Sequence, residues 1–203
     1  MNVHDNSVYS IASIPNTNYI VSGSLDKTIK IWDYTNGKVW KVLTGHTDAV
    51  SSVALISNTN YIVSGSKDST IKIWNYNNGE LLKTFSGHTD QVKSVVSFAN
   101  ANLIASGSYD ETIILWNFKG EEANIDLKIT LNGHTNYINS VAAITQTEYI
   151  ISGSDDSTIK IWNYKSGQLW KNLAGHTGEV LSVASIANTD LIVSGSADYT
   201  TRI

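Results

Sequence analysis

A segment of about 42 residues recurs along this chain, and this repeat limits the fold more than any other feature. The tripeptide Ser-Gly-Ser marks the same place in each copy. It begins at Ser22, Ser64, Ser106, Ser152 and Ser194, so the intervals are 42, 42, 46 and 42 residues. Repeats of this length typically form small units that bury their apolar faces by stacking on one another. The chain is therefore expected to consist of five copies of one structural unit, the last copy being shorter.

Each copy holds four short apolar runs separated by turn residues, as the second copy illustrates. The runs are 50–55, 61–64, 70–74 and 81–85. The third run alternates apolar and polar side chains, as a half-buried strand does, and Asn77-Asn78-Gly79 is typical of a hairpin turn. No segment sustains the period of a helix. Four short strands in each copy predict one blade of a β-propeller.

Four residue types recur at fixed distances in these copies: a His, a Ser 18 residues later, an Asp 4 residues after that and a Trp 6 residues further on. The sets are His4, Ser22, Asp26 and Trp32; His46, Ser64, Asp68 and Trp74; His88, Ser106, Asp110 and Trp116; His134, Ser152, Asp156 and Trp162; and His176, Ser194 and Asp198. Over essentially its whole length the chain resembles the WD-repeat β-propeller family. Departures from the family pattern are minor: Asn75, Asn117 and Asn163 stand where Asp usually follows the Trp, and Val3 replaces the Gly before His4.

The resemblance implies an all-β fold, a WD-repeat β-propeller of about five four-stranded blades with the last one incomplete. The whole chain, 1–203, is expected to form a single propeller segment, with repeats at 1–35, 36–77, 78–119, 120–165 and 166–203. The longer interval after Trp116 predicts a longer surface connection. Seven blades need about 290 residues at this repeat length, so we expect the five to be part of a larger, seven-bladed propeller. The alternatives are a five-bladed ring and an assembly of several copies joined through open blade edges.

The combination of Ser, His and Asp within one copy suggests a nucleophile with its base and orienting acid. Repetition argues against this interpretation, because an active site needs one such group and this chain carries the same spacing five times. The resemblance implies instead that the indole N–H binds Ser, the Ser hydroxyl binds His and the His ring binds Asp within each blade. We therefore expect no catalytic residue, no enzymatic activity and no cofactor.

Composition and spacing argue against several other kinds of site. The histidines lie about 42 residues apart and the chain has no Cys, so no metal site is predicted. Fourteen Lys and Arg against 18 Asp and Glu provide no basic excess, so nucleic acid is not an expected partner. No apolar stretch is long enough to span a membrane and no signal segment is evident, so the expected compartment is the cytoplasm, with the nucleus as the alternative.

Function is expected at positions where the copies stop resembling one another. Three positions qualify, and in the family they line one loop face. The first holds Ser7, Ala49, Gln91, Tyr137 and Glu179; the second holds Tyr9, Ser51, Lys93, Asn139 and Leu181; the third holds Leu25, Lys67, Tyr109, Asp155 and Ala197. Drift at exposed sites is the alternative explanation for any one of them. Because interfaces are enriched in exposed aromatic residues, we predict a partner-binding face that contains Tyr9, Lys67, Lys93, Tyr109, Tyr137, Asn139, Asp155 and Glu179.

The favoured function is that of a non-catalytic scaffold, which presents this loop face to protein or peptide partners. The alternative is a targeting or regulatory module of a larger protein, whose enzymatic or switch domain lies outside this chain. A kinase, a nucleotide-driven switch and a ubiquitin-ligase adaptor are examples of such a domain. The scaffold hypothesis predicts that the chain alone binds a partner, whereas the alternative predicts further coding sequence on one side.

Overall fold

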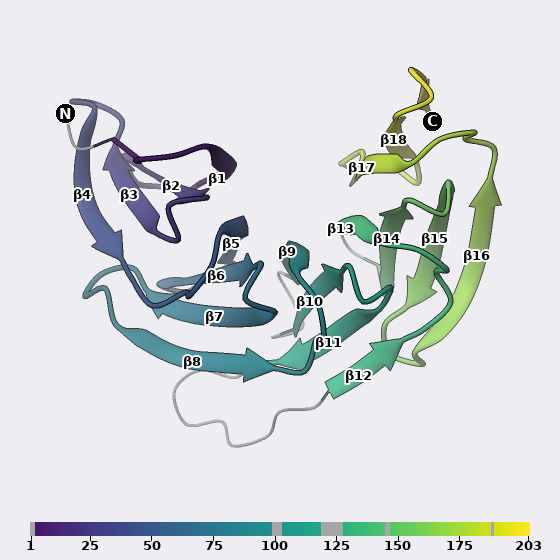
Figure 1. Ribbon diagram of the computed structural model, residues 1–203, viewed down its shortest axis with the longest axis horizontal. Coiled ribbons are helices and arrows are strands. Elements are labelled where there is room, and N and C mark those ends of the chain that lie inside the picture. Colours follow the sequence, from purple (N-terminus) through teal and green to yellow (C-terminus); the bar gives the residue numbers. More distant parts are fainter. Residues whose placement is uncertain (1–2, 99–102, 119–127, 145–146, 188) are drawn as a thin grey trace. The chain divides into compact units, whose positions relative to one another are not determined.

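Every regular element in the described part of the chain is a β-strand. The computed structural model describes residues 3–98, 103–118, 128–144, 147–187 and 189–203. Five antiparallel sheets follow one another in chain order (Figure 1). No helix that could cross a membrane occurs among these residues. The longer connection predicted after Trp116 falls on residues 119–127, which lie outside the described residues.

Each sheet is one blade, in which consecutive strands pair as neighbours. The strands of the first blade are β1 (Val8–Ser13), β2 (Tyr19–Ser24), β3 (Ile29–Asp33) and β4 (Lys38–Leu43), and those of the second are β5 (Val50–Ile56), β6 (Tyr61–Ser66), β7 (Thr70–Asn75) and β8 (Leu81–Ser86). The third blade has β9 (Val92–Phe98), β10 (Leu103–Ser108), β11 (Ile113–Asn117) and β12 (Lys128–Leu131), and the fourth has β13 (Ile138–Ala143), β14 (Tyr149–Ser154), β15 (Thr158–Asn163) and β16 (Gln168–Ala174). The fifth has β17 (Val180–Ser185), β18 (Ile192–Ser196) and β19 (Thr201–Arg202). The all-β prediction of four-stranded blades with an incomplete last blade is confirmed.

The turn between the second and third strands of each blade has the same backbone conformation. The residue after each tetrad Asp has a positive φ, at Lys27, Ser69, Glu111, Ser157 and Tyr199. A left-handed residue lets the chain reverse within two residues. The Asp side chain supports the reversal, since Asp68 Oδ1 accepts the backbone N–H of Thr70 at 3.0 Å. The repeated Asp is therefore a turn residue as well as a member of the tetrad.

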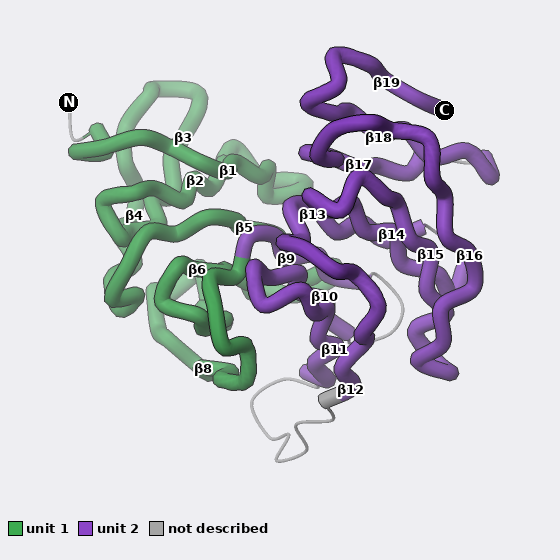
Figure 2. The backbone as a smooth tube through the Cα atoms, turned by 45° about the vertical axis from the view of Figure 1, so that its right-hand side comes forward, with its two compact units in different colours: residues 1–92 green, residues 93–203 purple. Residues whose placement is uncertain are grey.

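The described chain forms two compact units, residues 1–92 and 93–203 (Figure 2). Within the first unit, Val21 and Ile31 of the first blade pack in one cluster with Val53 and Trp74 of the second. Within the second unit, two clusters of the same kind join the third blade to the fourth and the fourth to the fifth. Each core thus lies between consecutive blades, because a single sheet cannot bury both of its apolar faces by itself.

The central glycine of Ser-Gly-Ser makes the closest approach between blades possible. A Cβ atom added to Gly23 would lie 2.7 Å from Val50 Cγ1 and 3.1 Å from Val53 Cγ1. At Gly153 the corresponding distances are 2.6 Å to Val180 and 3.0 Å to Val183. Contacts this short exclude any side chain larger than hydrogen. The recurrence of these glycines at the same place in each copy therefore follows from packing against the next blade.

Candidate functional site

The repeated His, Ser, Asp and Trp form a hydrogen-bonded chain, as the first blade shows. Trp32 Nε1 donates to Ser22 Oγ at 2.7 Å. His4 Nε2 lies 2.7 Å from Ser22 Oγ, and His4 Nδ1 lies 2.7 Å from Asp26 Oδ2. Because an ionised carboxylate can only accept, the Nδ1 atom carries the proton and Nε2 accepts the Ser hydroxyl. The four side chains thus satisfy one another in series.

The same contacts recur in the other blades. In the second and fourth blades the three distances lie between 2.6 and 2.9 Å. In the third blade Trp116 Nε1 donates to Ser106 Oγ at 2.8 Å, and both His88 and Ser106 are buried. In the fifth blade His176 lies 2.9 Å from Ser194 and 2.7 Å from Asp198. We call each of these sets a tetrad, although the fifth contains only three described members.

In the second, third and fourth blades the tetrad serines have no access for a substrate. Ser64, Ser106 and Ser152 are 0% exposed, and the indole N–H occupies one lone pair of each hydroxyl oxygen. A serine nucleophile must reach a carbonyl carbon from an open cleft. The geometry of the tetrads therefore fits a stabilising hydrogen-bond network better than a catalytic triad.

Four hydrogen bonds converge on the carboxylate of Asp68. One oxygen accepts from His46 Nδ1 at 2.8 Å and from the Thr47 amide at 2.9 Å. The other accepts from the amide and hydroxyl of Thr70 at 3.0 and 2.6 Å. Burial alone would raise the pKa of Asp68, but these donors outweigh it and hold the pKa well below its ordinary value. In the fourth blade burial lowers the pKa of His134, despite the opposing effect of Asp156.

Acidification is expected to lower the free energy of unfolding. His134 has a lower pKa in the folded chain than in the unfolded one, so stability declines as the pH falls below about 6.5. The contribution of Asp68 is complete above its unfolded pKa of about 4 and is lost as the pH falls through and below that value. Urea unfolding at pH values of about 7, 5 and 3 would measure both effects.

The control for this pH dependence is Asp68→Asn, which removes the titrating group and keeps one acceptor oxygen. This variant should be less stable than the wild type at neutral pH and should lose less stability below about pH 4. An equal loss in both proteins would show that Asp68 does not carry the acid response.

A backbone hydrogen bond connects the first and third variable positions within a blade. In four blades the amide before the tetrad Asp donates to the carbonyl of the first variable position. The pairs are Leu25 with Ser7, Lys67 with Ala49, Asp155 with Tyr137 and Ala197 with Glu179, each at 2.9 Å. The first and third variable positions of a blade are therefore neighbours at the same end of the sheet.

The second variable position is the extra residue of a β-bulge. The register of the first two strands shifts between Val8 and Ser10, and equivalent shifts enclose Ser51, Asn139 and Leu181. A bulge redirects one side chain out of the normal alternation of the strand. The bulge therefore takes Tyr9, Ser51, Asn139 and Leu181 out of the normal alternation of their strands.

In the second unit the structure brings three of the predicted residues into one group. The rings of Tyr109 and Tyr137 are stacked, with centroids 4.3 Å apart and planes inclined by 8°. Lys93 Nζ lies 5.7 Å from the centroid of the Tyr109 ring. Tyr137 is 41% exposed, whereas Tyr109 is only partly exposed. We call Lys93, Tyr109 and Tyr137 the tyrosine–lysine cluster.

Asn139 and Asp155 have a different environment from the other predicted residues. Asn139 Nδ2 donates to Asp155 Oδ1 and, at 3.1 Å, to the carbonyl of Val180 in the next blade. The equivalent Ser51 hydroxyl donates to the carbonyl of Val92. Asn139 and Ser51 therefore link consecutive blades, a role that the variation between repeats does not reveal.

The remaining predicted residues belong to the first unit and to the fifth blade. In the first unit Lys67 Nζ lies 5.7 Å from the centroid of the Tyr9 ring, which is a second lysine and tyrosine contact. Glu179 is exposed in the fifth blade and its carbonyl accepts the Ala197 amide. No group of three or more His, Cys, Asp or Glu that could hold a metal occurs within residues 3–98, 103–118, 128–144, 147–187 and 189–203.

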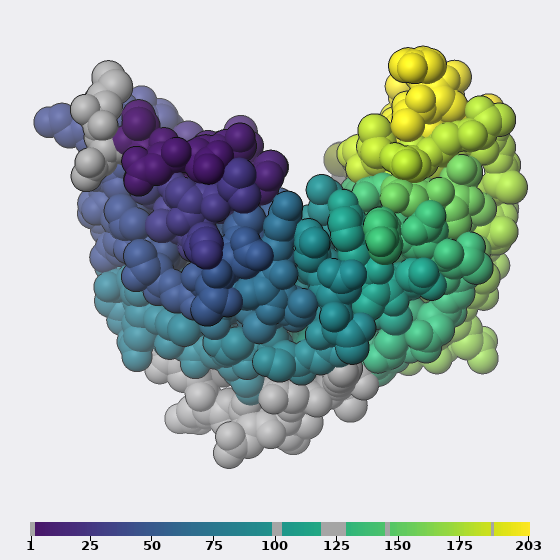
Figure 3. Space-filling model, in the orientation of Figure 1, coloured from purple at the N-terminus to yellow at the C-terminus, as the bar shows by residue number. Residues whose placement is uncertain are grey.

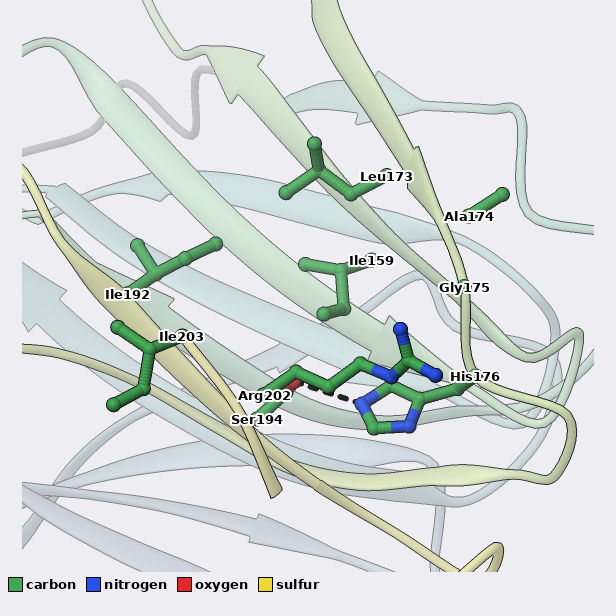
Figure 4. A pocket seen from close by; sticks show the side chains of 9 residues that line it. All are labelled: Ile159, Leu173, Ala174, Gly175, His176, Ile192, Ser194, Arg202 and Ile203. Carbon is green, nitrogen blue, oxygen red and sulfur yellow. Dashed lines mark hydrogen bonds between the residues drawn. The ribbon is translucent and has the colours of Figure 1, made fainter. Parts of the chain in front are cut away.

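A pocket of about 360 Å³ adjoins the fifth tetrad, and the sequence analysis did not predict it (Figure 4). Its lining consists of Ile159, Leu173, Ala174, Gly175, His176, Ile192, Ser194, Arg202 and Ile203. In the second and fourth blades the tip of the tetrad indole lies 3.1 Å from the Cβ position of the Gly before the His. At Gly175 the nearest atom is Arg202 Nη1, at 2.8 Å. The guanidinium thus lies where the indole tip lies in the second and fourth blades.

Comparison with known proteins agrees with the repeat. The model of the family described as WD domain, G-beta repeat matches residues 1–33, 37–75, 79–117, 126–163 and 167–203. The chain is also similar to the Denticleless protein homolog of Danio rerio, with 42% identity over 43 residues. That match covers 21% of this chain and 7% of the relative. Its length is that of about one repeat, so the similarity concerns the repeat and not the whole relative.

Proposed function

Because this chain belongs to the WD40 repeat family, whose repeats serve as protein-interaction scaffolds, we propose that its tyrosine–lysine cluster binds a protein or peptide partner. The observation that carries the proposal is the stack of Tyr109 and Tyr137 with Lys93 beside it. No chemical step by this chain is part of the proposed function.

Stacked tyrosines are well suited to binding because they are ordered before a partner arrives. A side chain that is already held loses little conformational entropy when it is covered. Tyr137 is 41% exposed, so a partner can still bury a large part of its ring. Aromatic residues with an apolar body and a polar tip are frequent at the centres of interfaces. Tyr137 is therefore the proposed centre of the contact.

The surroundings of the cluster indicate the chemistry of the partner. Lys93 is exposed and offers a cation beside the rings. Asp155 is already engaged by the Asn139 amide, which reduces its availability to a partner. The preferred partner is a peptide segment with an apolar side chain for Tyr137 and a carboxylate for Lys93.

Substitution of both tyrosines should abolish most of this binding. Peptides selected on the immobilised wild-type chain from a phage-displayed random library are the probe. For such peptides, Tyr109→Ala/Tyr137→Ala should raise the dissociation constant by about tenfold or more, as expected for a contact worth at least about 1.4 kcal/mol. Fluorescence anisotropy with labelled peptides would measure the change.

Trp40→Ala is the matched control, since Trp40 is also 41% exposed and stacks on Tyr19 at 4.5 Å. It removes an aromatic side chain of similar exposure from the outer strand of the first blade. Selected peptides should bind this variant as they bind the wild type. Equal weakening by both substitutions, or retention of binding by the double variant, would contradict the proposal.

The alternative role as a targeting module of a larger protein remains a prediction. It is compatible with the same binding face, because a module of this kind also recognises a partner. Binding of the selected peptides by the 203-residue chain is therefore expected under both roles.

A further inference from the structure

The dipeptide Asn-Gly occurs three times in this chain, at residues 36–37, 78–79 and 132–133. An asparagine loses its side-chain amide most readily before a glycine, because glycine has no side chain to hinder attack of its main-chain nitrogen on the asparagine side chain. The three dipeptides are chemically the same and differ only in their surroundings. The folded structure therefore decides which of them reacts.

In the turn between β3 and β4 both reacting groups of the first dipeptide are held. The Gly37 amide, which would be the nucleophile, donates to the carbonyl of Asp33 at 2.9 Å. The Asn36 side chain donates to Asp33 Oδ2 at 2.8 Å and accepts the Lys38 amide at 2.9 Å. These hydrogen bonds must break before the nitrogen can reach the side chain.

The turn between β7 and β8 restrains the second dipeptide in the same way. The Gly79 amide donates to the carbonyl of Asn75 at 2.8 Å. Asn78 Nδ2 donates to Glu80 Oε2, and Asn78 Oδ1 accepts the Glu80 amide, both at 3.0 Å. In both hairpin turns the nucleophile and the group that it would attack are thus engaged elsewhere.

The third dipeptide lies in the connection between β12 and β13, where these restraints are missing. Asn132 and Gly133 are both exposed. Figure 3 shows the surface of this part of the second unit in green. Among the described residues, neither the Asn132 side chain nor the Gly133 amide has a hydrogen-bond partner. The nucleophile and the side chain are therefore free to approach each other.

We infer that Asn132 is a site of spontaneous deamidation. The Gly133 nitrogen loses its proton to water and attacks Asn132 Cγ, the bond from Cγ to Nδ2 breaks, and ammonia leaves a five-membered succinimide ring behind. Water is the only co-reactant and then opens the ring. Opening at Cγ gives aspartate in an unaltered main chain. Opening at the main-chain carbonyl carbon gives isoaspartate, in which the main chain runs through Cβ and Cγ.

Isoaspartate at this place lengthens the main chain immediately before the fourth tetrad. The Cβ position of Gly133 lies 3.1 Å from the tip of the Trp162 ring. The next residue, His134, is buried and lies 2.7 Å from Ser152 and 2.6 Å from Asp156. Packing this close does not accommodate an extra main-chain bond without moving the contacts. The isoaspartyl product should therefore loosen the fourth blade and lower the melting temperature of the chain.

Peptide mapping by mass spectrometry during incubation in a mildly alkaline buffer tests the site. Deamidation at Asn132 should be several-fold faster than at Asn36 or Asn78 and should yield both isoaspartate and aspartate. In the chain unfolded by urea, the three positions should react at similar rates, because the restraints of the folded structure are gone. Similar rates in the folded chain, or a preference for Asn132 that persists in urea, would overturn the inference.

The variant Asn132→Gln tests the effect on the fourth blade, because glutamine must form a larger ring and reacts much more slowly. It keeps an amide at the same exposed position. After incubation the wild type should melt a few degrees lower than before, whereas Asn132→Gln should keep its melting temperature. Freshly purified Asn132→Asp has the new charge without the longer main chain and should melt close to the fresh wild type.

Three results would contradict the effect on the tetrad. The first is an equal fall in melting temperature for the wild type and Asn132→Gln. The second is an unchanged melting temperature in wild type that mass spectrometry shows to contain isoaspartate. The third is a fresh Asn132→Asp that melts as low as the incubated wild type, since the added charge and not the longer main chain would then be the cause.

Discussion

Trp162→Ala is expected to lower the free energy of unfolding by about 3 to 5 kcal/mol, the range observed when buried aromatic residues are truncated. Trp162 is 2% exposed and belongs to the core that joins the third and fourth blades. Its Nε1 atom also donates to Ser152 Oγ at 2.9 Å. The substitution therefore leaves a large void and removes one hydrogen-bond donor from Ser152 Oγ, whose side chain is 0% exposed.

Trp170→Ala in the same blade is the control. Trp170 is 58% exposed on β16 and contacts Tyr149 with ring centroids 4.9 Å apart. Its replacement should cost about 1 kcal/mol or less, because most of the ring already contacts water. Urea unfolding monitored by circular dichroism would compare the two variants with the wild type. Similar losses from both substitutions would show that the tetrad tryptophan has no special role in the blade.

The blades were predictable from sequence because the signals that form them are local. A period of about 42 residues, four apolar runs and a turn in each copy are all visible within one repeat. The tetrad was equally accessible, since His4, Ser22, Asp26 and Trp32 have a spacing that recurs. Because each copy carries the same residues at the same spacing, the pattern found in one copy predicts the tetrad contacts in the others.

Contacts between blades were less accessible to sequence analysis. Tyr109 and Tyr137 belong to different blades, and only the stacking of the third blade on the fourth brings their rings to 4.3 Å. The bond from Asn139 to the carbonyl of Val180 likewise depends on how two blades meet. Variation at position 139 suggested a free surface residue, whereas the structure shows a side chain that joins blades. Sequence periodicity describes the structure of one repeat and carries little information about which side chains of neighbouring blades meet.

The role of the Ser-Gly-Ser glycines also becomes evident only from the packing of blades. Their backbone does not require glycine, because Gly23, Gly107 and Gly153 do not have positive φ angles. The requirement comes from the branched residues of the next blade, which fill the space of a Cβ atom. A Ser-Gly-Ser glycine with no atom close to its Cβ position should therefore tolerate alanine. The need for glycine can thus be tested by comparing two such positions of this chain.

Gly153→Ala is expected to lower the free energy of unfolding by about 1 to 3 kcal/mol, the usual effect of an extra methyl group in a well-packed core. The new Cβ atom would lie 2.6 Å from Val180 Cγ1 and 3.0 Å from Val183 Cγ1. Both valines are on β17 and are almost fully buried, so neither can move without opening the contact between the fourth and fifth blades. Thermal unfolding would report the loss.

Gly195→Ala is the matched control, because it makes the same chemical change in the same tripeptide of the next repeat. Nothing lies within 4 Å of its Cβ position, and its φ is not positive. This variant should be as stable as the wild type or slightly more stable, since alanine restricts the unfolded chain more than glycine does. The difference in unfolding free energy between the two variants measures the contribution of the contact between blades. Any intrinsic preference of the strand for glycine is the same in both variants. Equal destabilisation by both would mean that the strand itself requires glycine, and the packing explanation for the tripeptide would be wrong.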